Sequence, residues 1–443
     1  MIGSTEFARR RKQLLGLIGP QAVAIVPAAP RMARSQDAYY RYRQDSDLAY
    51  LTGFDEYEAV LVLVPGRAAG ESILFCRERD VERERWDGEI LGPERAPEHM
   101  QLDDAFPITD IDDILPNLLD GRARVYYHFG RDPEFDLQVL GWINRLRVQR
   151  VRGARPPESI VALGFLLSEM RLIKSAAEIR LLKKAASIAV EAHLWVMQNC
   201  KPGQGEHEIE ADILHVFRKR GAVAAYEPTV AAGKNACTLH YRAHRSKLKA
   251  GELLLVDAGA EVDCYASDIT RTIPISGRFN KAQRGLYEVV LAAQNAAIAA
   301  SHVGNPWENV HQAALEVICE GLISLKLLKG SVKEALRSGK YKKYFMHKTG
   351  HWLGLDVHDV GDYRIDGQSR LLEPGMVFTI EPGIYIPADD VNAPAALRGV
   401  AVRIEDEVLV RANGPLLLTE AAVRAADEIE ALMRVGHSKH LKA

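Results

Sequence analysis

The stretch "VDAGAEVDCYASDITRT" at residues 256–272 has the pattern of two β-strands joined by a turn. Asp257 and Asp268 lie equally far from its midpoint at Val262 and Asp263, so a regular hairpin would place them opposite each other. Directly opposed like charges destabilise a strand pair, and burial of an unpaired carboxylate is costly. The stretch therefore predicts cations between the two aspartates, whereas Asp263 is expected to be an ordinary turn residue.

Composition and charge narrow the class of protein. The chain has 443 residues, of which 47% are hydrophobic and 26% charged, and this size favours two domains. The net charge of −2 lacks the excess of positive charge that is typical of nucleic-acid-binding proteins. No window of about 18 apolar residues is present, so we expect no membrane span.

The cysteines indicate in which cellular compartment the protein works. The chain has five, an odd number, and none of them forms a CxxC pair, which argues against a disulfide framework and against a thiolate zinc site. The N-terminal segment is interrupted by Gly and Pro and matches a signal peptide poorly. We therefore expect a cytoplasmic protein.

The first third of the chain alternates strand-like and helix-like runs, which predicts an α/β layer. The strand-like runs are 22–29, 59–65, 72–76 and 124–129, and the helical candidates include 6–18 and 111–119. A segment rich in Arg, Gly and Pro at 147–159 leads to a domain boundary. We predict domains at residues 1–173 and 174–443.

The second domain begins with a helix over about 175–200, where Ser175 and Glu178 form a capping box. The pattern then gives strands between helical segments, which indicates an α+β class. The further helices are expected at 206–220, 281–301, 306–325 and 419–435, and the late strands near 376–386 and 400–410.

Further acidic residues interrupt apolar strands of this domain. Glu381 lies in "VFTIEPGIYI" and Glu405 in "GVAVRIEDEVLV", while "HKTGHWLGLDVHD" supplies His351. With Asp257 and Asp268 they form a hard, oxygen-rich ligand set. Four carboxylates carry a charge of −4, which two divalent ions neutralise, and two such ions can hold a hydroxide as a nucleophile.

Each of these residues alone also fits an ordinary role as a turn residue, a strand end or a charge on an exposed edge strand. The order Asp, Asp, His, Glu, Glu within apolar strands favours the metal site. Other histidines are expected to be packed or solvated, namely His193, His215, His302 and His311.

The sequences and the order of these four motifs resemble those of the pita-bread metallopeptidase family, which includes methionine aminopeptidases, prolidases and Xaa-Pro aminopeptidases. Two segments outside the metal motifs, "YRYRQDSDLAYLTGF" at 40–54 and "MRLIKSAAEI" at 170–179, look most like bacterial aminopeptidase P. The resemblance covers nearly the whole chain. It implies an α+β fold, with a C-terminal pita-bread domain preceded by a smaller α/β domain that methionine aminopeptidases lack.

The resemblance implies a role for each metal residue. Asp257 would bind one ion, Asp268 and Glu405 would bridge both, and His351 and Glu381 would bind the other. Glu381 would also accept the proton of the bridging water as a general base. Manganese is the expected metal, and cobalt, zinc or iron would also suit the site.

The resemblance also implies residues that contact substrate. His240 would steady the substrate or the tetrahedral intermediate, and His358 would contact the scissile carbonyl and the proline. His347 and Arg403 would line the same pocket. Tyr385, on the same strand face as Glu381, would stack on the proline ring.

Two first-domain residues, Asp37 and Trp86, resemble family positions that close the site. The counterpart of Trp86 reaches a neighbouring subunit within a tetramer, so a homo-oligomer, a dimer or a tetramer, is expected. One departure from the family is the loop 361–370, which is longer than the bacterial pattern. We expect Gln368 to stand where the family has an Arg that would pair with Asp37, and Arg364 or Arg370 to be the candidates that could substitute for it.

The implied activity is hydrolysis of the N-terminal Xaa-Pro bond, which releases the first residue of peptides with proline at the second position. That bond is a tertiary amide with no N–H and a restricted chain, so a shaped pocket can select it. A prolidase is the alternative enzyme. A metal-free binding module, as in histone chaperones, or a creatinase-like amidinohydrolase is disfavoured because all five metal positions are filled.

Overall fold

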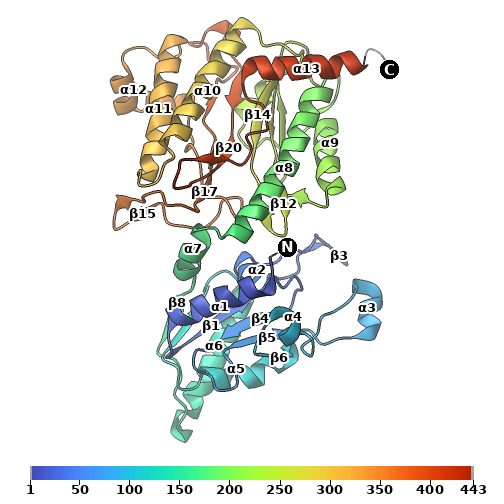
Figure 1. Cartoon of the computed structure of the whole chain (residues 1–443), viewed down its shortest axis with the longest axis vertical. Coiled ribbons are helices and arrows are strands. Elements are labelled where there is room, and N and C mark those ends of the chain that lie inside the picture. The colour runs from blue at the N-terminus through green and yellow to red at the C-terminus, as the bar shows by residue number, and fades with distance from the viewer. Residues whose placement is uncertain (1, 441–443) are drawn as a thin grey trace. The chain divides into compact units, whose positions relative to one another are not determined.

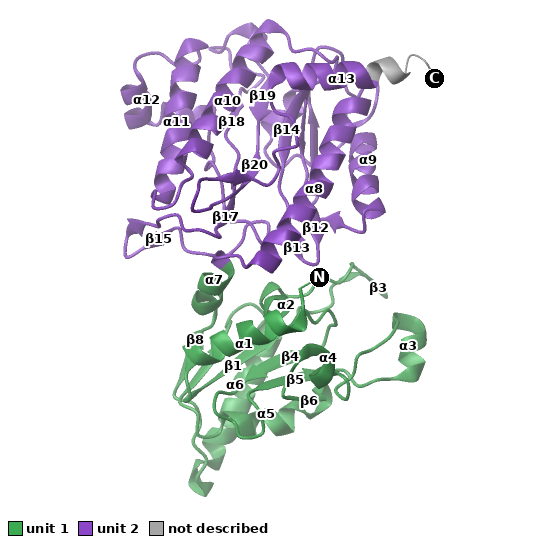
Figure 2. Ribbon diagram, viewed as in Figure 1, with its two compact units in different colours: residues 1–171 green, residues 172–443 purple. Residues whose placement is uncertain are grey.

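The structure is a computed structural model that describes residues 2–440. The chain divides into two compact units, and the division falls between Arg171 and Leu172 (Figure 2). The predicted boundary after residue 173 lies two residues further along. No helix in residues 2–440 combines the length and the apolar character needed to cross a membrane.

Unit 1 contains a six-stranded mixed sheet in the order β6-β5-β4-β1-β7-β8. Its central strand β1 pairs antiparallel with β4 and parallel with β7. The strands are β1 (Ala22–Pro27), β4 (Val60–Leu63), β5 (Ser72–Cys76), β6 (Asp104–Pro107), β7 (Arg124–Tyr127) and β8 (Ser159–Ala162). The predicted α/β layer and its four strand-like runs are confirmed.

Helices cover this sheet and complete its core. Apolar residues of α5 (Ile111–Leu119) and α6 (Pro133–Val148) form one buried cluster with residues of the strands. The remaining helices of the unit are α1 (Ser4–Ile18), α2 (Ser46–Thr52), α3 (Val81–Asp87), α4 (Ala96–Met100) and α7 (Gly164–Leu172). A small hairpin of β2 (Ala33–Ser35) and β3 (Ala38–Tyr39) stands apart from the sheet.

The helices of unit 2 begin and end close to the predicted positions. Ser175 caps α8 (Ala176–Asn199) through a capping box with Glu178, as predicted. The next helices are α9 (Glu206–Lys219), α10 (Lys281–Ala300), α11 (Trp307–Ser324) and α12 (Val332–Ser338). Figure 1 shows α8 and α9 on one side of the strands of this unit, and α10 and α11 on the other.

The last helix, α13 (Ala426–His440), starts later than the predicted residue 419. The side chain of Arg271 donates hydrogen bonds to the carbonyl oxygens of Ala422 and Val423. Thr419 donates its hydroxyl to the buried Asp406. These contacts hold residues 419–425 against the strands, so the predicted start was wrong.

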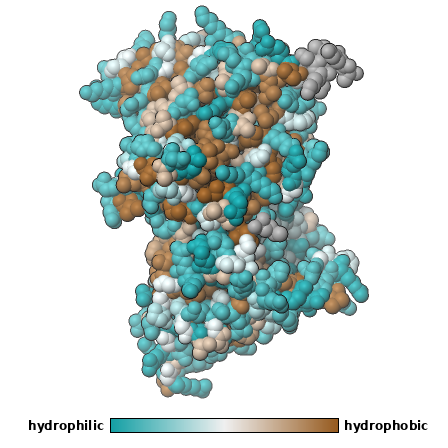
Figure 3. Space-filling model, in the orientation of Figure 1, coloured by the Kyte–Doolittle hydropathy of each residue, from teal (hydrophilic) through white to brown (hydrophobic). Residues whose placement is uncertain are grey.

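The strands of unit 2 form several small sheets between these helices. The sheets are β10 (Thr229–Ala232), β11 (Leu253–Asp257) and β14 (Thr270–Pro274); β9 (Val223–Ala224), β12 (Ala260–Val262) and β13 (Tyr265–Ala266); β17 (Val377–Ile380), β20 (Asp406–Leu409) and β21 (Leu416–Leu417); β18 (Gly383–Tyr385) and β19 (Ala401–Arg403); and β15 (Arg364–Ile365) and β16 (Gln368–Ser369). In the view of Figure 3, apolar side chains gather over the middle of this unit, within a more hydrophilic border.

Two strands predicted as continuous are each broken in two. The run 376–386 breaks between β17 and β18 at Glu381 and Pro382, and a proline has no N–H to continue a ladder. The run 400–410 breaks between β19 and β20 at Ile404 and Glu405. Both breaks therefore fall at predicted metal residues.

The register of the central hairpin also differs from the prediction. Asp257 pairs with Thr270, not with Asp268. The turn lies at Asp263 and Cys264, whose φ angles of 50° and 66° are those of a type I′ turn. Asp263 is thus a turn residue, as expected, and Asp257 and Asp268 lie diagonally rather than directly opposite.

Candidate metal centre

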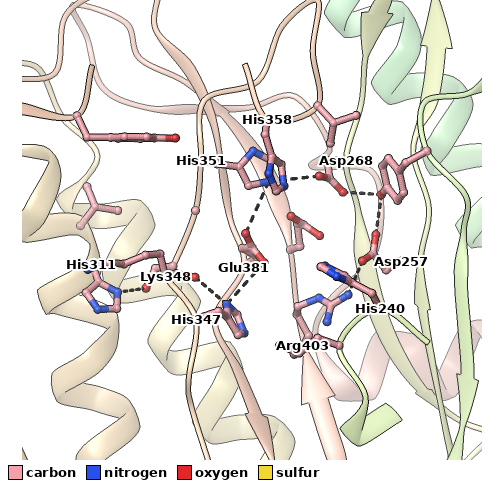
Figure 4. A pocket seen from close by; sticks show the side chains of 18 of the residues that line it. His240, Asp257, Asp268, His311, His347, Lys348, His351, His358, Glu381 and Arg403 are labelled. Atoms are coloured by element: carbon pink, nitrogen blue, oxygen red, sulfur yellow. Dashed lines mark hydrogen bonds and ion pairs between the residues drawn. The ribbon is translucent and has the colours of Figure 1, made fainter. Parts of the chain in front are cut away.

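A cavity of about 760 Å³ in unit 2 collects most of the predicted site residues (Figure 4). They reach it from the ends of strands: Asp257 ends β11, Glu381 follows β17, and Glu405 follows β19. The predicted residues that line the cavity are His240, Asp257, Asp268, His347, His351, His358, Glu381, Arg403 and Glu405.

Three ligand groups converge most closely. One donor atom each from Asp268, His351 and Glu405 lies within 4.8 Å of the others. His351 Nε2 is 3.4 Å from a carboxylate oxygen of Asp268 and 3.7 Å from one of Glu381. The other ring nitrogen, Nδ1, donates to the carbonyl of Trp352 at 3.0 Å. This backbone contact orients the imidazole with Nε2 toward the carboxylates, as in many metal-binding histidines.

The crowded carboxyl groups perturb one another. Burial, together with the charge of Asp268, raises the pKa of Asp257, and burial raises the pKa of Glu381 to about 7. Burial and the three neighbouring carboxylates raise the pKa of Glu405 well above its ordinary value. Their full ionisation therefore requires additional positive charge in the cluster.

His351 responds to the same crowding. Burial alone would lower its pKa, but the hydrogen bond and charge of Asp268 outweigh burial and raise it to about 9. If no other cation is bound, the protonated His351 and Arg403 are the main positive charges that offset the negative charge of the carboxylates. The donor set, four carboxylates and one oriented imidazole, fits two divalent ions better than it fits a single proton.

Tyr226 is a site residue that the sequence did not reveal. Its hydroxyl lies 2.6 Å from Asp257 Oδ1 and 2.5 Å from Asp268 Oδ1. It belongs to a loop far from both aspartates in the sequence, and no periodicity marks it. The tyrosine links the two carboxylates that the hairpin places diagonally.

Thr270 was also missed, although a signal was present. It lies two residues after Asp268, so strand alternation places both on one face. Its hydroxyl donates to Glu405 at 2.6 Å and accepts from Arg403 Nε at 3.0 Å. Arg403 also forms an ion pair with Asp257. Arg403 and Thr270 therefore fix two of the carboxylates predicted to bind metal.

The structure corrects the expected role of Tyr385. The side chain is 1% exposed and does not line the cavity, so its ring offers no face to a proline. Its hydroxyl accepts from Arg403 Nη1 at 3.2 Å and lies 2.9 Å from His347 Nε2. Because His347 Nδ1 donates to the carbonyl of Lys348, Nε2 is free to accept the tyrosine proton. Tyr385 thus positions His347 and Arg403.

Other histidines complete the wall of the cavity. His240 and His358 are exposed on it, and the His358 ring lies 4.0 Å from that of His351. His311, which we expected to be packed or solvated, also lines the cavity and lies 2.7 Å from the Thr349 hydroxyl. His193 is buried against the Ala258 carbonyl, as expected of a packed histidine.

The first-unit residues are not among those that line the cavity. Asp37 is exposed in the turn between β2 and β3, and Trp86 on α3 is 88% exposed. Gln368 is exposed in β16. The roles expected of Asp37 and Trp86 remain predictions.

Family models and curated relatives match both units. Residues 180–412 match the model of metallopeptidase family M24, and residues 7–126 match that of the aminopeptidase P N-terminal domain. The chain is 40% identical to a Xaa-Pro aminopeptidase of Escherichia coli, over 98% of each protein. It is 36% identical to human Xaa-Pro aminopeptidase 3, over 97% of this chain and 86% of that protein.

Solved structures agree with the fold along the whole chain. An aminopeptidase of Pseudomonas aeruginosa is 51% identical, with a TM-score of 0.97 and 99% of each chain covered. Escherichia coli aminopeptidase P with the inhibitor Pro-Leu is 40% identical, with a TM-score of 0.95 and 99% of each chain covered. A zinc-substituted form of the same enzyme with product is also 40% identical, with a TM-score of 0.95 and coverage of 98% of this chain and 99% of that one. The predicted α+β fold, with a pita-bread domain after a smaller α/β domain, is confirmed.

Proposed function

The chain belongs to metallopeptidase family M24, and we propose that it is an Xaa-Pro aminopeptidase, a metallo-exopeptidase that releases the first residue from peptides with proline at the second position. The relatives that match it along nearly its whole length bear this name. The observation that carries the proposal is the convergence of four carboxylates and one oriented imidazole in a cavity of about 760 Å³, room enough for a short peptide.

The metal residues divide between two ions. Asp257 would hold one ion, His351 and Glu381 the other, and Asp268 and Glu405 would be shared. When bound, two divalent ions neutralise the four carboxylates, activate water and polarise the carbonyl under attack. We propose manganese as the native metal, and the zinc-substituted relative supports tolerance of other ions.

Glu381 acts first as the general base and then as the general acid of the reaction. One of its carboxylate oxygens accepts a proton from the attacking water, and the other faces His351 Nε2 at 3.7 Å. The leaving group is the proline nitrogen of a tertiary amide, which must gain a proton to depart as an amine. The same carboxyl group delivers that proton.

The remaining residues orient the peptide. His240 and His358 lie exposed on the cavity wall, where their ring nitrogens can donate to the carbonyl oxygen as charge develops on it. Burial, followed by the charge of Arg403, lowers the pKa of His347 to about 4. His347 is therefore neutral, and its contacts with Tyr385 and Lys348 fix it as a rigid wall for the proline ring.

We propose further that the enzyme works in the cytoplasm as a homo-oligomer, a dimer or a tetramer. The cysteines Cys76, Cys200, Cys237, Cys264 and Cys319 are all free, which suits a reducing compartment. The large exposed area of Trp86 suits a contact with a neighbouring subunit. Asp37 and Trp86 would then close the site from unit 1, and light scattering of wild type and Trp86→Ala would test the assembly.

A peptide panel tests the activity. Protein that has been chelated and resupplied with manganese is offered Ala-Pro-Ala, its N-acetylated form, the dipeptide Ala-Pro, and Ala-Ala-Ala. We expect release of alanine from Ala-Pro-Ala, with little turnover of the other three. Cleavage confined to Ala-Pro would indicate a prolidase, and equal cleavage of the acetylated peptide would contradict an aminopeptidase.

A further inference from the structure

The cationic side chains that line the cavity differ in their partners. The lining includes Arg242, Arg364, Arg403 and Lys348. Each of the three arginines pairs with a carboxylate that also lines the cavity. The pairs are Arg242 with Glu227, Arg364 with Glu308 at 2.8 Å, and Arg403 with Asp257.

Lys348 has no such partner. Among residues 2–440, no carboxylate forms an ion pair with its ammonium group, and the side chain is exposed at the cavity. Its backbone is fixed, because its carbonyl accepts the Nδ1 proton of His347 at 2.7 Å. In Figure 4, Lys348 lies on the side of the cavity where His311 lies, across from Asp257 and Asp268. The lining of the cavity therefore includes one positive charge that no carboxylate of the described residues pairs with.

The surroundings of Lys348 do not cancel this charge. Burial, and then the charge of Lys348 itself, lower the pKa of His311 to about 4, so this neighbour is neutral near pH 7. The segment that leads to Lys348 carries Lys340 and Lys342, both exposed, and Lys343, which pairs with Asp390. These three lysines do not line the cavity, so Lys348 carries the lysine charge that a bound ligand would meet there.

We propose that Lys348 binds a carboxylate on the leaving portion of the substrate and so sets a preference for acidic peptides. This inference rests on the proposed function. The released residue carries the free ammonium group, which Lys348 would repel, so a carboxylate partner belongs beyond the scissile bond.

Two substrate groups offer that carboxylate. In Xaa-Pro-Yaa the C-terminal carboxylate lies two residues beyond the scissile bond, a span of roughly 7 Å in an extended chain. In a longer or amidated peptide, an Asp or Glu side chain at the third position lies at a similar reach. Both sources present the same chemistry to the ammonium group.

Four peptides distinguish these sources: Ala-Pro-Ala and Ala-Pro-Ala-amide, and Ala-Pro-Asp-amide and Ala-Pro-Asn-amide. For the manganese-loaded wild type, we expect a KM about three- to tenfold lower for the carboxylate member of a pair, as for a partly solvated ion pair. An effect in the first pair alone identifies the C-terminus, and an effect in the second pair alone identifies the side chain.

Substitutions then assign the effect to one residue. Lys348→Met keeps the alkyl stem and should bring the KM ratio of each pair close to one, whereas Lys348→Arg should restore it. Lys342→Met, an exposed lysine outside the cavity lining, should keep the wild-type ratio. A wild-type KM ratio close to one in both pairs, or a carboxylate preference that persists in Lys348→Met, would overturn this inference and leave the proposed function intact. Failure to cleave any Xaa-Pro peptide would instead contradict the proposed function.

Discussion

The pKa values of individual carboxyl groups in this protein depend on burial and on the neighbouring charged groups. Glu381 interrupts an apolar strand, is surrounded by Asp257, Asp268 and His351, and has a pKa raised to about 7 by burial. Apolar strands make such acidic residues conspicuous in a sequence. For that reason the ligand candidates could be predicted from the amino-acid order.

Replacement of Glu381 by Gln tests its role as the proton carrier. The amide keeps the size of the side chain but cannot accept the proton of water, so kcat for Ala-Pro-Ala should fall by about 10²- to 10⁴-fold. Circular dichroism and thermal unfolding should show a folded protein. Activity within a factor of three of wild type would contradict the assignment.

Tyr226 shows why some site residues escape sequence analysis. Its single hydroxyl proton serves two carboxylates at 2.6 and 2.5 Å, yet its loop has no pattern that marks function. His311 and Lys348 also lie outside the acidic strand pattern. Their positions follow from tertiary packing, which spacing alone does not give.

Tyr226→Phe should weaken manganese binding by about 10- to 100-fold, because partners that orient metal ligands commonly have effects of this size. Manganese affinity, measured by competition with a chromophoric chelator, reports this without reference to activity. Tyr265→Phe is the matched control, since its buried hydroxyl donates to Glu178 at 3.0 Å. Equal affinities for Tyr226→Phe and wild type would show that the tyrosine does not position the aspartates.

At the scale of the element, helices were more predictable than strands. Ser175 and Glu178 form the capping box that their spacing predicts, because a cap is a local interaction. The register of the central hairpin and the breaks at Glu381 and Glu405 were wrong in the prediction. Those features depend on contacts with distant strands, such as the hydrogen bond from the Glu405 N–H to the Thr270 carbonyl.

Gly259 in the central hairpin provides a test at this scale. A Cβ atom there would lie 1.7 Å from the carbonyl oxygen of Ser267, so one strand would have to move. We expect Gly259→Ala to lower the free energy of unfolding by at least about 2 kcal/mol and to weaken metal binding.

Gly285→Ala is the matched control for that substitution. Gly285 lies inside α10, where a Cβ would meet Leu325 at an ordinary 3.6 Å. The added methyl should stabilise the helix by about 0.5–1 kcal/mol. Urea denaturation measures both variants, and equal shifts would refute the steric account of the hairpin.

The whole molecule combines two units whose sheets differ in kind. The mixed sheet of unit 1 could be predicted as an α/β layer from its alternating runs. The small sheets of unit 2 could be predicted only as α+β from residue pattern, and the resemblance to a known family supplied the pita-bread arrangement. Local patterns specify elements, while the pairing of short strands depends on the complete fold.

Buried groups also make the stability of the molecule depend on pH. Burial lowers the pKa of His193 from 6.5 to about 4 in the folded state. The unfolded chain therefore takes up the proton first, and stability present above pH 6.5 is lost as the pH falls toward 4. This group contributes a loss of about 3 kcal/mol across that window.

His193→Gln keeps a donor for the Ala258 carbonyl and removes this titration. Between pH 6.5 and 4, the free energy of unfolding of this variant should fall less than that of wild type. The difference between the two losses should be up to about 3 kcal/mol. Denaturant titrations at a series of pH values measure the difference. Parallel pH profiles for the two proteins would be inconsistent with a buried neutral imidazole.

The central claim is that two divalent cations keep the buried carboxylates ionised and that hydrolysis depends on them. The direct measurement is a manganese titration of chelated protein, with bound metal and the release of alanine from Ala-Pro-Ala recorded together. We predict two bound equivalents per chain, with activity absent in the chelated protein and restored as the ions bind. Full activity in metal-free protein, or no binding at the carboxylate cluster, would contradict the account.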